Sequence, residues 1–136
     1  MRRPVLLLVM IGIVLVVASG VALAFSQTGT NQADTLTGGP NSDKLAGGGG
    51  NDTVEGKQGD DFLFGDHGNS DTLKGGVGND FINSADGNPG DSVSGGDDTD
   101  TCVVDEGDTI NGTSVPATQV PGTALNTCEK VYVVPQ

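Results

Sequence analysis

Apolar residues recur every nine positions through the middle of the chain, and polar residues stand on both sides of most of them. If Gly47–Glu55 (G-G-G-G-N-D-T-V-E) is taken as the repeat unit, the apolar residue occupies its eighth position. Nine repeats run from Gly29 to Asn111, and their eighth residues are Leu36, Leu45, Val54, Leu63, Leu73, Ile82, Val93, Cys102 and Ile110. A polar, apolar, polar triplet is typical of a short strand with one buried face.

Such a short strand is not stable alone, so the period predicts strands stacked on one another around a narrow apolar lumen. A short period held over many copies indicates a repeat architecture and not a conventional globular domain. The period is not uniform, because Gly65–Lys74 has one additional residue, Ser84–Ser94 has two and Val104–Asn111 has one fewer, so the positions in these repeats are counted by alignment.

The polar half of the repeat has a regularity of its own. Position six is aspartate in all nine copies: Asp34, Asp43, Asp52, Asp61, Asp71, Asp80, Asp91, Asp100 and Asp108. Glycines around it permit tight turns and leave backbone carbonyls uncovered. Stacked strands lie about 4.8 Å apart, so successive carboxylates on one side would repel unless they are neutralised. A hard cation bound by oxygen atoms would do this, and calcium suits a shared cage of carbonyls better than magnesium does.

The repeat resembles the haemolysin-type (RTX) calcium-binding repeat, G-G-x-G-x-D-x-U-x with U apolar, which Gly47–Glu55 and Gly75–Asn83 match at every position. The resemblance implies an all-β fold, a right-handed parallel β-roll (β-solenoid) with two repeats in each coil and calcium between the turns of successive coils. The ligands it implies are aspartates two repeats apart, together with backbone carbonyls near Gly38, Gly47, Gly49, Gly56, Gly65 and Gly75. We expect about five ions.

The pairs of aspartates two repeats apart differ in their spacing. Asp34 with Asp52, and Asp43 with Asp61, have the ideal separation of 18 residues. Later pairs depart from it, so sites that use Asp91, Asp100 or Asp108 are expected to be the least regular.

Composition and charge limit the classes of partner that the protein is expected to bind. The 136 residues include 23 glycines, no tryptophan, and 18 acidic against six basic residues, for a net charge of -12. Such a composition favours disorder, whereas the fixed apolar phase favours order, so we expect the fold to depend on a bound cation. A polyanion is a poor partner for nucleic acid or an anionic membrane.

Residues 1–24 are predicted to be an export signal. Arg2 and Arg3 precede the apolar stretch Val5–Val17, and Ala22-Leu23-Ala24 is a small-x-small cleavage pattern. An uncleaved anchor is the alternative, because residues 4–24 could span a bilayer. In either case residues 25–111, the repeats, and residues 112–136, the tail, are expected at the cell surface or outside the cell.

Cys102 and Cys128 are the only cysteines, and outside the cytoplasm they are expected to form a disulfide, with two free thiols as the alternative. The tail has no repeat and ends in Val131–Val134, which predicts a closing strand. Solenoids need atypical ends, so we interpret the tail as a cap held by the disulfide.

Phe62, Phe64 and Phe81 are predicted on one outward face, as a binding patch or as a surface that the tail covers. The other face has a file of hydroxyl residues, which strand propensity alone explains: Thr35, Thr53, Thr72, Ser92 and Thr109. We expect a calcium-binding structural or binding module and no enzyme, since no catalytic constellation is evident. The alternatives are a surface adhesin or ice- or glycan-binding module and, less favoured, an accessory module of a secreted hydrolase.

Overall fold

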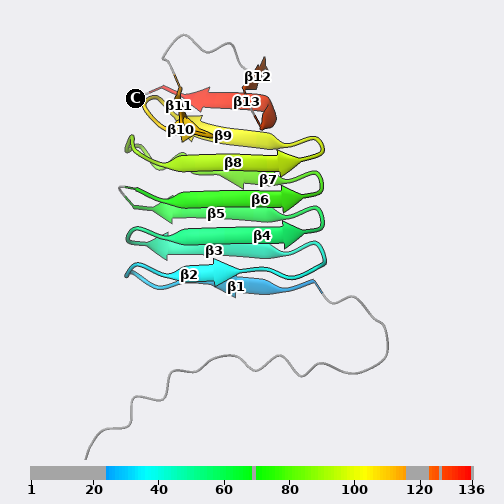
Figure 1. The fold of residues 1–136 in the computed structure, drawn as a ribbon. Coiled ribbons are helices and arrows are strands. Elements are labelled where there is room, and N and C mark those ends of the chain that lie inside the picture. Colours follow the sequence, from blue (N-terminus) through cyan, green and yellow to red (C-terminus); the bar gives the residue numbers. More distant parts are fainter. Residues whose placement is uncertain (1–23, 69, 116–122, 126, 136) are drawn as a thin grey trace, which may run out of the picture.

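The computed structural model describes residues 24–68, 70–115, 123–125 and 127–135, and these contain strands and turns but no helix. Successive strands alternate between two sheets that lie one behind the other (Figure 1). Sheet A has the order β1 (Ser26–Thr28), β3 (Lys44–Gly49), β5 (Phe62–His67), β7 (Phe81–Asn83), β9 (Thr101–Asp105), β13 (Cys128–Val134) and β12 (Thr123–Leu125). Sheet B has the order β11 (Thr113–Ser114), β10 (Thr109–Ile110), β8 (Ser92–Asp97), β6 (Thr72–Val77), β4 (Thr53–Gln58) and β2 (Thr35–Thr37).

The repeat strands pair in parallel and in the register of the repeat. Leu45 lies opposite Leu63 in sheet A, and Val54 lies opposite Leu73 in sheet B. Each strand therefore stacks on the strand two repeats away, and two repeats form one coil. The predicted parallel β-solenoid is confirmed.

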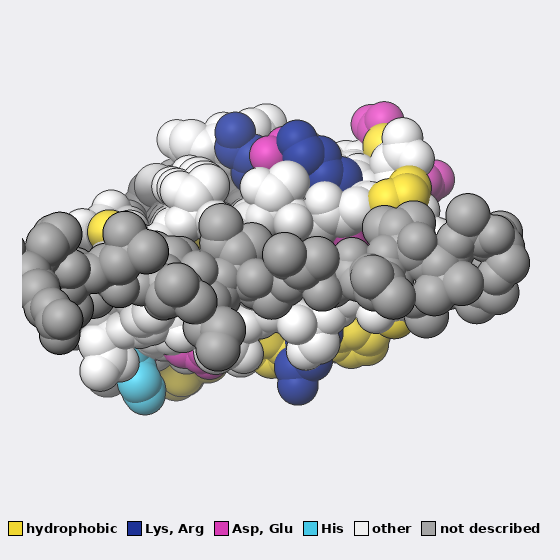
Figure 2. All heavy atoms as spheres, turned by 90° about the horizontal axis from the view of Figure 1, so that it is seen from below, with side chains coloured by type: hydrophobic (Ala, Val, Ile, Leu, Met, Phe, Trp, Pro, Cys, Tyr) yellow, Lys and Arg dark blue, Asp and Glu magenta, His cyan; other side chains and the backbone are white. Residues whose placement is uncertain are grey.

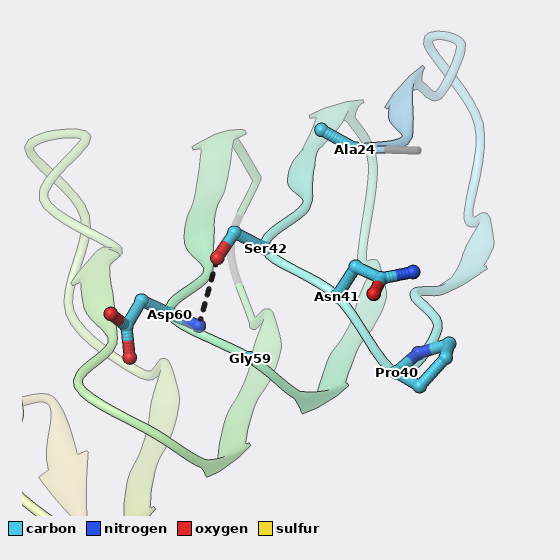
Figure 3. A pocket seen from close by; sticks show the side chains of 6 residues that line it. All are labelled: Ala24, Pro40, Asn41, Ser42, Gly59 and Asp60. Carbon is cyan, nitrogen blue, oxygen red and sulfur yellow. Dashed lines mark hydrogen bonds between the residues drawn. The ribbon is translucent and has the colours of Figure 1, made fainter. Parts of the chain in front are cut away.

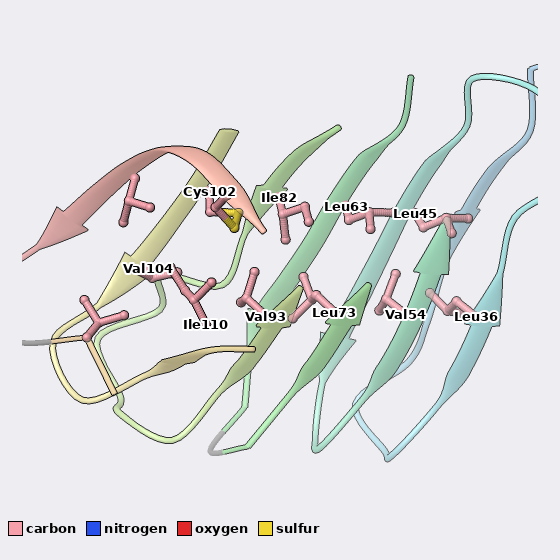
Figure 4. Close-up of a cluster of buried hydrophobic side chains, with 13 residues drawn as sticks. Leu36, Leu45, Val54, Leu63, Leu73, Ile82, Val93, Cys102, Val104 and Ile110 are labelled. Carbon is pink, nitrogen blue, oxygen red and sulfur yellow. A yellow bond between two sulfur atoms is a disulfide. The ribbon is translucent and has the colours of Figure 1, made fainter. Parts of the chain in front are cut away.

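The eighth residues of all nine repeats form the core. Leu45, Val54 and Leu63 are completely buried, and Leu36 at the start of the file is 3% exposed. Figure 4 follows this file from Leu36 to Ile110. Burial of each such side chain contributes roughly 1.5–3 kcal/mol, so stacking supplies a core that no single repeat has.

The stack begins one strand earlier than the count of nine repeats. β1 pairs in parallel with β3, with Ser26 opposite Lys44, although residues 25–28 have no glycine and no aspartate. These residues keep only the strand half of a repeat, which is why the spacing of glycine and aspartate did not reveal it. Phe25, immediately before β1, packs against the buried core.

Both sheets end in antiparallel hairpins at the carboxyl end of the stack. β10 pairs with β11 in sheet B, and β13 pairs with β12 in sheet A. β13 also extends sheet A in parallel with β9, and the Cys102–Cys128 disulfide joins the two strands with a Cα–Cα distance of 5.9 Å. The predicted closing strand and disulfide are confirmed, and Cys102 lies at the end of the lumen.

The predicted export signal falls almost entirely on residues 1–23, which lie outside the described residues. Within the described part of the chain, no helix has the length and apolar character needed to cross a membrane. The division at residues 24 and 111 remains a prediction.

Candidate metal centre

The turns between strands depend on backbone conformations that glycine adopts most readily. Gly48 and Gly50, at positions two and four, have φ values of 102° and 112°. Lys57 occupies position two of the next repeat with a φ of 89°, so a side chain is tolerated there. These turns place the aspartate of position six immediately before each repeat strand, and Asp52, like most of these aspartates, is buried.

The aspartates form two columns, one along each sheet. The sheet B column contains Asp34, Asp52, Asp71, Asp91 and Asp108, and the sheet A column contains Asp43, Asp61, Asp80 and Asp100. In both columns the backbone N–H of one aspartate donates to Oδ1 of the aspartate two repeats later. The distances include 2.8 Å from Asp52 to Asp71 and 2.8 Å from Asp61 to Asp80. Every predicted pair is joined in this way.

The second oxygen of most of these carboxylates has no partner. Oδ2 is buried and makes no hydrogen bond in six residues: Asp52, Asp61, Asp71, Asp80, Asp91 and Asp100. A buried polar atom without a partner costs about 1–3 kcal/mol, and more when it is charged. Each column therefore contains several buried carboxylate oxygens whose negative charge no described protein group compensates.

Each of these oxygens in the sheet A column lies beside a backbone carbonyl. A Cβ atom on Gly56 would overlap Oδ2 of Asp61 and lie 2.8 Å from the carbonyl oxygen of Gly75. A Cβ atom on Gly75 would meet Oδ2 of Asp80 and lie 2.5 Å from the carbonyl oxygen of Gly95. We call this arrangement of a position-one glycine, a carboxylate oxygen and a carbonyl oxygen a cradle.

Sheet B has similar cradles at its first repeats. Oδ2 of Asp52 and the carbonyl oxygen of Gly65 both lie beside the Cα atom of Gly47. Any side chain at these glycines would fill the cradle. The glycines of position one thus leave space next to oxygen atoms, a role distinct from the positive φ values of positions two and four.

Burial raises the pKa of several aspartates well above the ordinary value. Loss of water around the charged form is the main cause, and it raises the pKa of Asp80 and of Asp91 to about 7 and that of Asp61 to about 6. Nearby aspartates raise these pKa values further. Asp34 differs, because hydrogen bonds from Thr30 lower its pKa.

The donor set fits a hard divalent cation. Carboxylate and carbonyl oxygens are the ligands of calcium, which accepts about six to eight of them with tolerant geometry. Across the described residues, no three Asp, Glu, His or Cys side chains converge as a metal site. A cation in a cradle would therefore need backbone carbonyls beside its carboxylates, which is what the cradles offer.

The ends of the columns differ from their middles. Oδ2 of Asp34 accepts a hydrogen bond from the N–H of Thr30, and Oδ2 of Asp43 accepts one from the N–H of Gly39, each at 2.6 Å. At the other end, Oδ2 of Asp108 accepts from the N–H of Asp105 at 2.8 Å and from the hydroxyl of Ser84. These aspartates are satisfied by protein groups.

The six glycines named from the sequence have different positions. The carbonyl oxygens of Gly47, Gly56, Gly65 and Gly75 each lie in a cradle. Gly38 is the position-one glycine of the cradle that contains the carbonyl oxygen of Gly56. Gly49 instead donates its N–H to the carbonyl oxygen of Thr30 at 2.7 Å. Sequence reasoning did not include Glu129, whose Oε2 accepts a hydrogen bond from the N–H of Asp100. The sequence E-K-V-Y at residues 129–132 resembles the end of a repeat with glutamate in place of aspartate.

An open hollow of about 430 Å³ lies outside the columns, between the turns that precede β3 and β5 (Figure 3). The backbone N–H of Asp60 donates to the hydroxyl of Ser42 there at 3.2 Å. This bond ties two coils together.

Comparison with known proteins gives one family. Residues 28–63, 46–69 and 67–89 match the RTX calcium-binding nonapeptide repeat, in four copies. No curated protein and no solved structure gives a significant match.

Proposed function

Because the chain carries RTX calcium-binding nonapeptide repeats over residues 28–89, we propose that the protein is an exported calcium-binding module whose fold depends on the ion. It acts outside the cytoplasm, at the cell surface or in the extracellular space, as a structural or binding element. The buried, unpartnered Oδ2 atoms of the two columns are the observation that carries this proposal.

Each central aspartate has two tasks in this proposal. Its Oδ1 accepts a backbone N–H from the previous coil, as Asp71 does from Asp52, and so holds the register of the strands. Its Oδ2 supplies the negative ligand atom, and in Asp52, Asp61, Asp80 and Asp100 this oxygen lies in a cradle beside a carbonyl oxygen. Bound calcium supplies the positive charge that allows these carboxylates to remain ionised while buried.

Ion binding and folding are then one process. Without a cation, the six unpartnered oxygens oppose the stacking that buries the apolar file. Sites in extracellular calcium-binding modules have dissociation constants of about 0.1–1 mM, so the chain would order after export, where calcium is abundant.

Circular dichroism of the chain without residues 1–24 tests this proposal. Strand signal should appear on addition of calcium and disappear with excess chelator. A strand signal that excess chelator leaves unchanged would contradict ion-dependent folding, and native mass spectrometry would give the number of ions bound.

A second candidate function is adhesion through the outer face of sheet A. Phe62 lies opposite Phe81 on neighbouring strands, with ring centroids 6.0 Å apart, and Phe64 is 6.1 Å from Phe81. The ammonium group of Lys44 lies 5.5 Å from the centre of the Phe64 ring. Figure 2, a view along the stack, shows hydrophobic side chains beside a basic one along one side of the molecule.

This aromatic patch, Phe62, Phe64 and Phe81, is accessible. Phe62 is 53% exposed, and β13 extends the sheet at its edge instead of lying across it. Flat aromatic surfaces with a nearby cation suit glycans or protein partners. The hydroxyl file of sheet B is also in register, with Thr53 opposite Thr72, but its residues are ordinary for strands.

Replacement of Phe62 and Phe81 by serine tests the second candidate. Surface or glycan binding should be lost while calcium-dependent folding remains. Thr53→Ser with Thr72→Ser provides the matched control at the same repeat position on sheet B. Equal binding by both double variants would contradict a role for the aromatic patch, and loss of folding would show that the phenylalanines serve stability.

A further inference from the structure

The tail reproduces the contacts of a repeat without having its sequence. The N–H of Asp100 donates to Oε2 of Glu129 at 2.7 Å, just as the N–H of Asp80 donates to Oδ1 of Asp100 at 2.9 Å. The next residue follows the same rule, because the N–H of Lys130 donates to the carbonyl oxygen of Asp100 at 3.0 Å. Val131 then lies opposite Cys102 and is completely buried, as a residue of position eight would be.

A cradle is present at the same level. A Cβ atom on Gly95 would overlap both Oδ2 of Asp100 and the carbonyl oxygen of Thr127. Gly75, one coil earlier, has Oδ2 of Asp80 and the carbonyl oxygen of Gly95 in the equivalent places. The N–H of Gly95 also donates to the hydroxyl of Thr127 at 3.0 Å, which holds the tail against the turn.

We propose that Asp100, Glu129 and the carbonyl oxygen of Thr127 form a terminal calcium site, which the tail completes. This site lies beyond residues 28–89, where the RTX repeats match. It rests on the proposed function, since it assumes that the cradles of the repeats bind calcium, and it adds a site whose second acidic residue comes from the tail.

The unpartnered oxygen of Asp100 is the observation that points to a cation. Asp100 is completely buried, and its Oδ2 has no hydrogen-bond partner. The charged side chains that act on Asp100 are negative: Glu129, Asp98 and Asp97. A cap that acted only through hydrogen bonds would leave Oδ2 of Asp100 without a partner. At the end of the other column, by contrast, Oδ2 of Asp108 accepts hydrogen bonds from protein groups.

The site also links the ion to the disulfide. Glu129 directly follows Cys128, and Cys102 lies two residues after Asp100. The disulfide therefore holds together the two chain segments that carry the acidic residues. An ion between them would clamp the tail to the last coil of the repeats.

Calcium counting by native mass spectrometry tests the proposal, with wild type, Glu129→Gln and Glu106→Gln compared in saturating calcium. Glutamine can still accept the hydrogen bond from Asp100 but has no negative charge. We expect Glu129→Gln to bind one ion fewer than wild type. Glu106, an exposed residue outside both columns, provides the matched change in charge and should not alter the count.

The outcomes separate this inference from the function on which it rests. If wild type binds no calcium, the proposed function fails. If wild type binds calcium and Glu129→Gln binds the same number, the terminal site alone is overturned. If Glu129→Gln folds too poorly for mass spectrometry, the dependence of its melting temperature on calcium concentration gives the number of ions released on unfolding. That number must be one lower than in wild type, and an equal number overturns the inference.

Discussion

The backbone N–H of Asp52 donates to Oδ1 of Asp71 at 2.8 Å, while Oδ2 of the same carboxylate is buried without a partner. One oxygen of Asp71 thus stabilises the stack, and the other raises its energy unless a cation is bound. The two effects belong to one side chain, and a conservative substitution can separate them.

Asp71→Asn keeps an acceptor for the N–H of Asp52 but removes the negative charge. In chelator we expect the variant to be more stable than wild type by about 1–3 kcal/mol, because a buried charge is removed. In calcium we expect it to be less stable and to bind fewer ions. Urea unfolding in calcium and the residual strand signal by circular dichroism in chelator measure the two effects, and Glu106→Gln, at an exposed position outside both columns, is the control. A stability and an ion count in calcium equal to those of the control would mean that the charge of Asp71 has no role in ion binding.

The stability of the ion-free chain should depend on pH in the opposite sense to that of the calcium-bound chain. Burial raises the pKa of Asp80 and of Asp91 from 3.8 to about 7. Between these values the folded ion-free chain binds more protons than the unfolded chain does, so its stability increases as the pH falls from about 7 toward 3.8.

In calcium, protons compete with the ion for the same oxygens, so stability should decrease over the same interval. The residual strand signal in chelator and thermal unfolding in calcium, each followed at several pH values, measure the two slopes. Two slopes of the same sign would contradict the assignment of these carboxylates to the cation.

Two glycine substitutions distinguish a strained backbone from a close contact. Gly76 and Gly87 have φ values of 124° and 93°, so alanine at either position costs about 1–2 kcal/mol. A Cβ atom at Gly76 would also overlap the carbonyl oxygen of Lys57, whereas one at Gly87 would lie in open space. Gly76→Ala should therefore be less stable than Gly87→Ala by a further 1–3 kcal/mol, roughly. Equal melting temperatures in calcium would show that the coils are not packed as closely as described.

Removal of the disulfide should weaken the carboxyl end of the stack. Cys102 and Cys128 are 26 residues apart, and a loop of that size gives a stabilisation of about 3 kcal/mol in the chain-entropy model. The double variant Cys102→Ala with Cys128→Ala should lose about that much in urea unfolding. A reducing agent should lower the stability of wild type but leave the double variant unchanged. Insensitivity of wild type to reduction would show that the crosslink does not contribute.

The central repeats could be predicted because their sequence and their contacts have the same period. Val54 is in phase with every other buried residue of the file, and Asp52 is in phase with its column, so the strands, the register and the paired aspartates follow from counting. The exposure of Phe62 followed from the same count.

The ends could not be predicted in this way, because their contacts lack the repeat sequence. β1 forms without glycine or aspartate, and Thr127 and Glu129 occupy the places of a glycine and an aspartate with fewer residues between them. Their positions depend on hairpins and a disulfide, which connect segments across a variable length of chain. Lys57 likewise adopts a positive φ that its residue type does not indicate.

Because successive strands alternate between the two sheets, the fold depends on whether an odd or an even number of repeats is added or removed. Deletion of the single repeat Gly47–Glu55 would move every later strand to the opposite sheet relative to β1 and β3, so Phe62 and Phe81 would no longer share a face with Lys44. Deletion of two consecutive repeats would shorten the stack by one coil and keep every face and both ends. Chains of this design can therefore lengthen or shorten in evolution by even numbers of repeats without losing the surface they present.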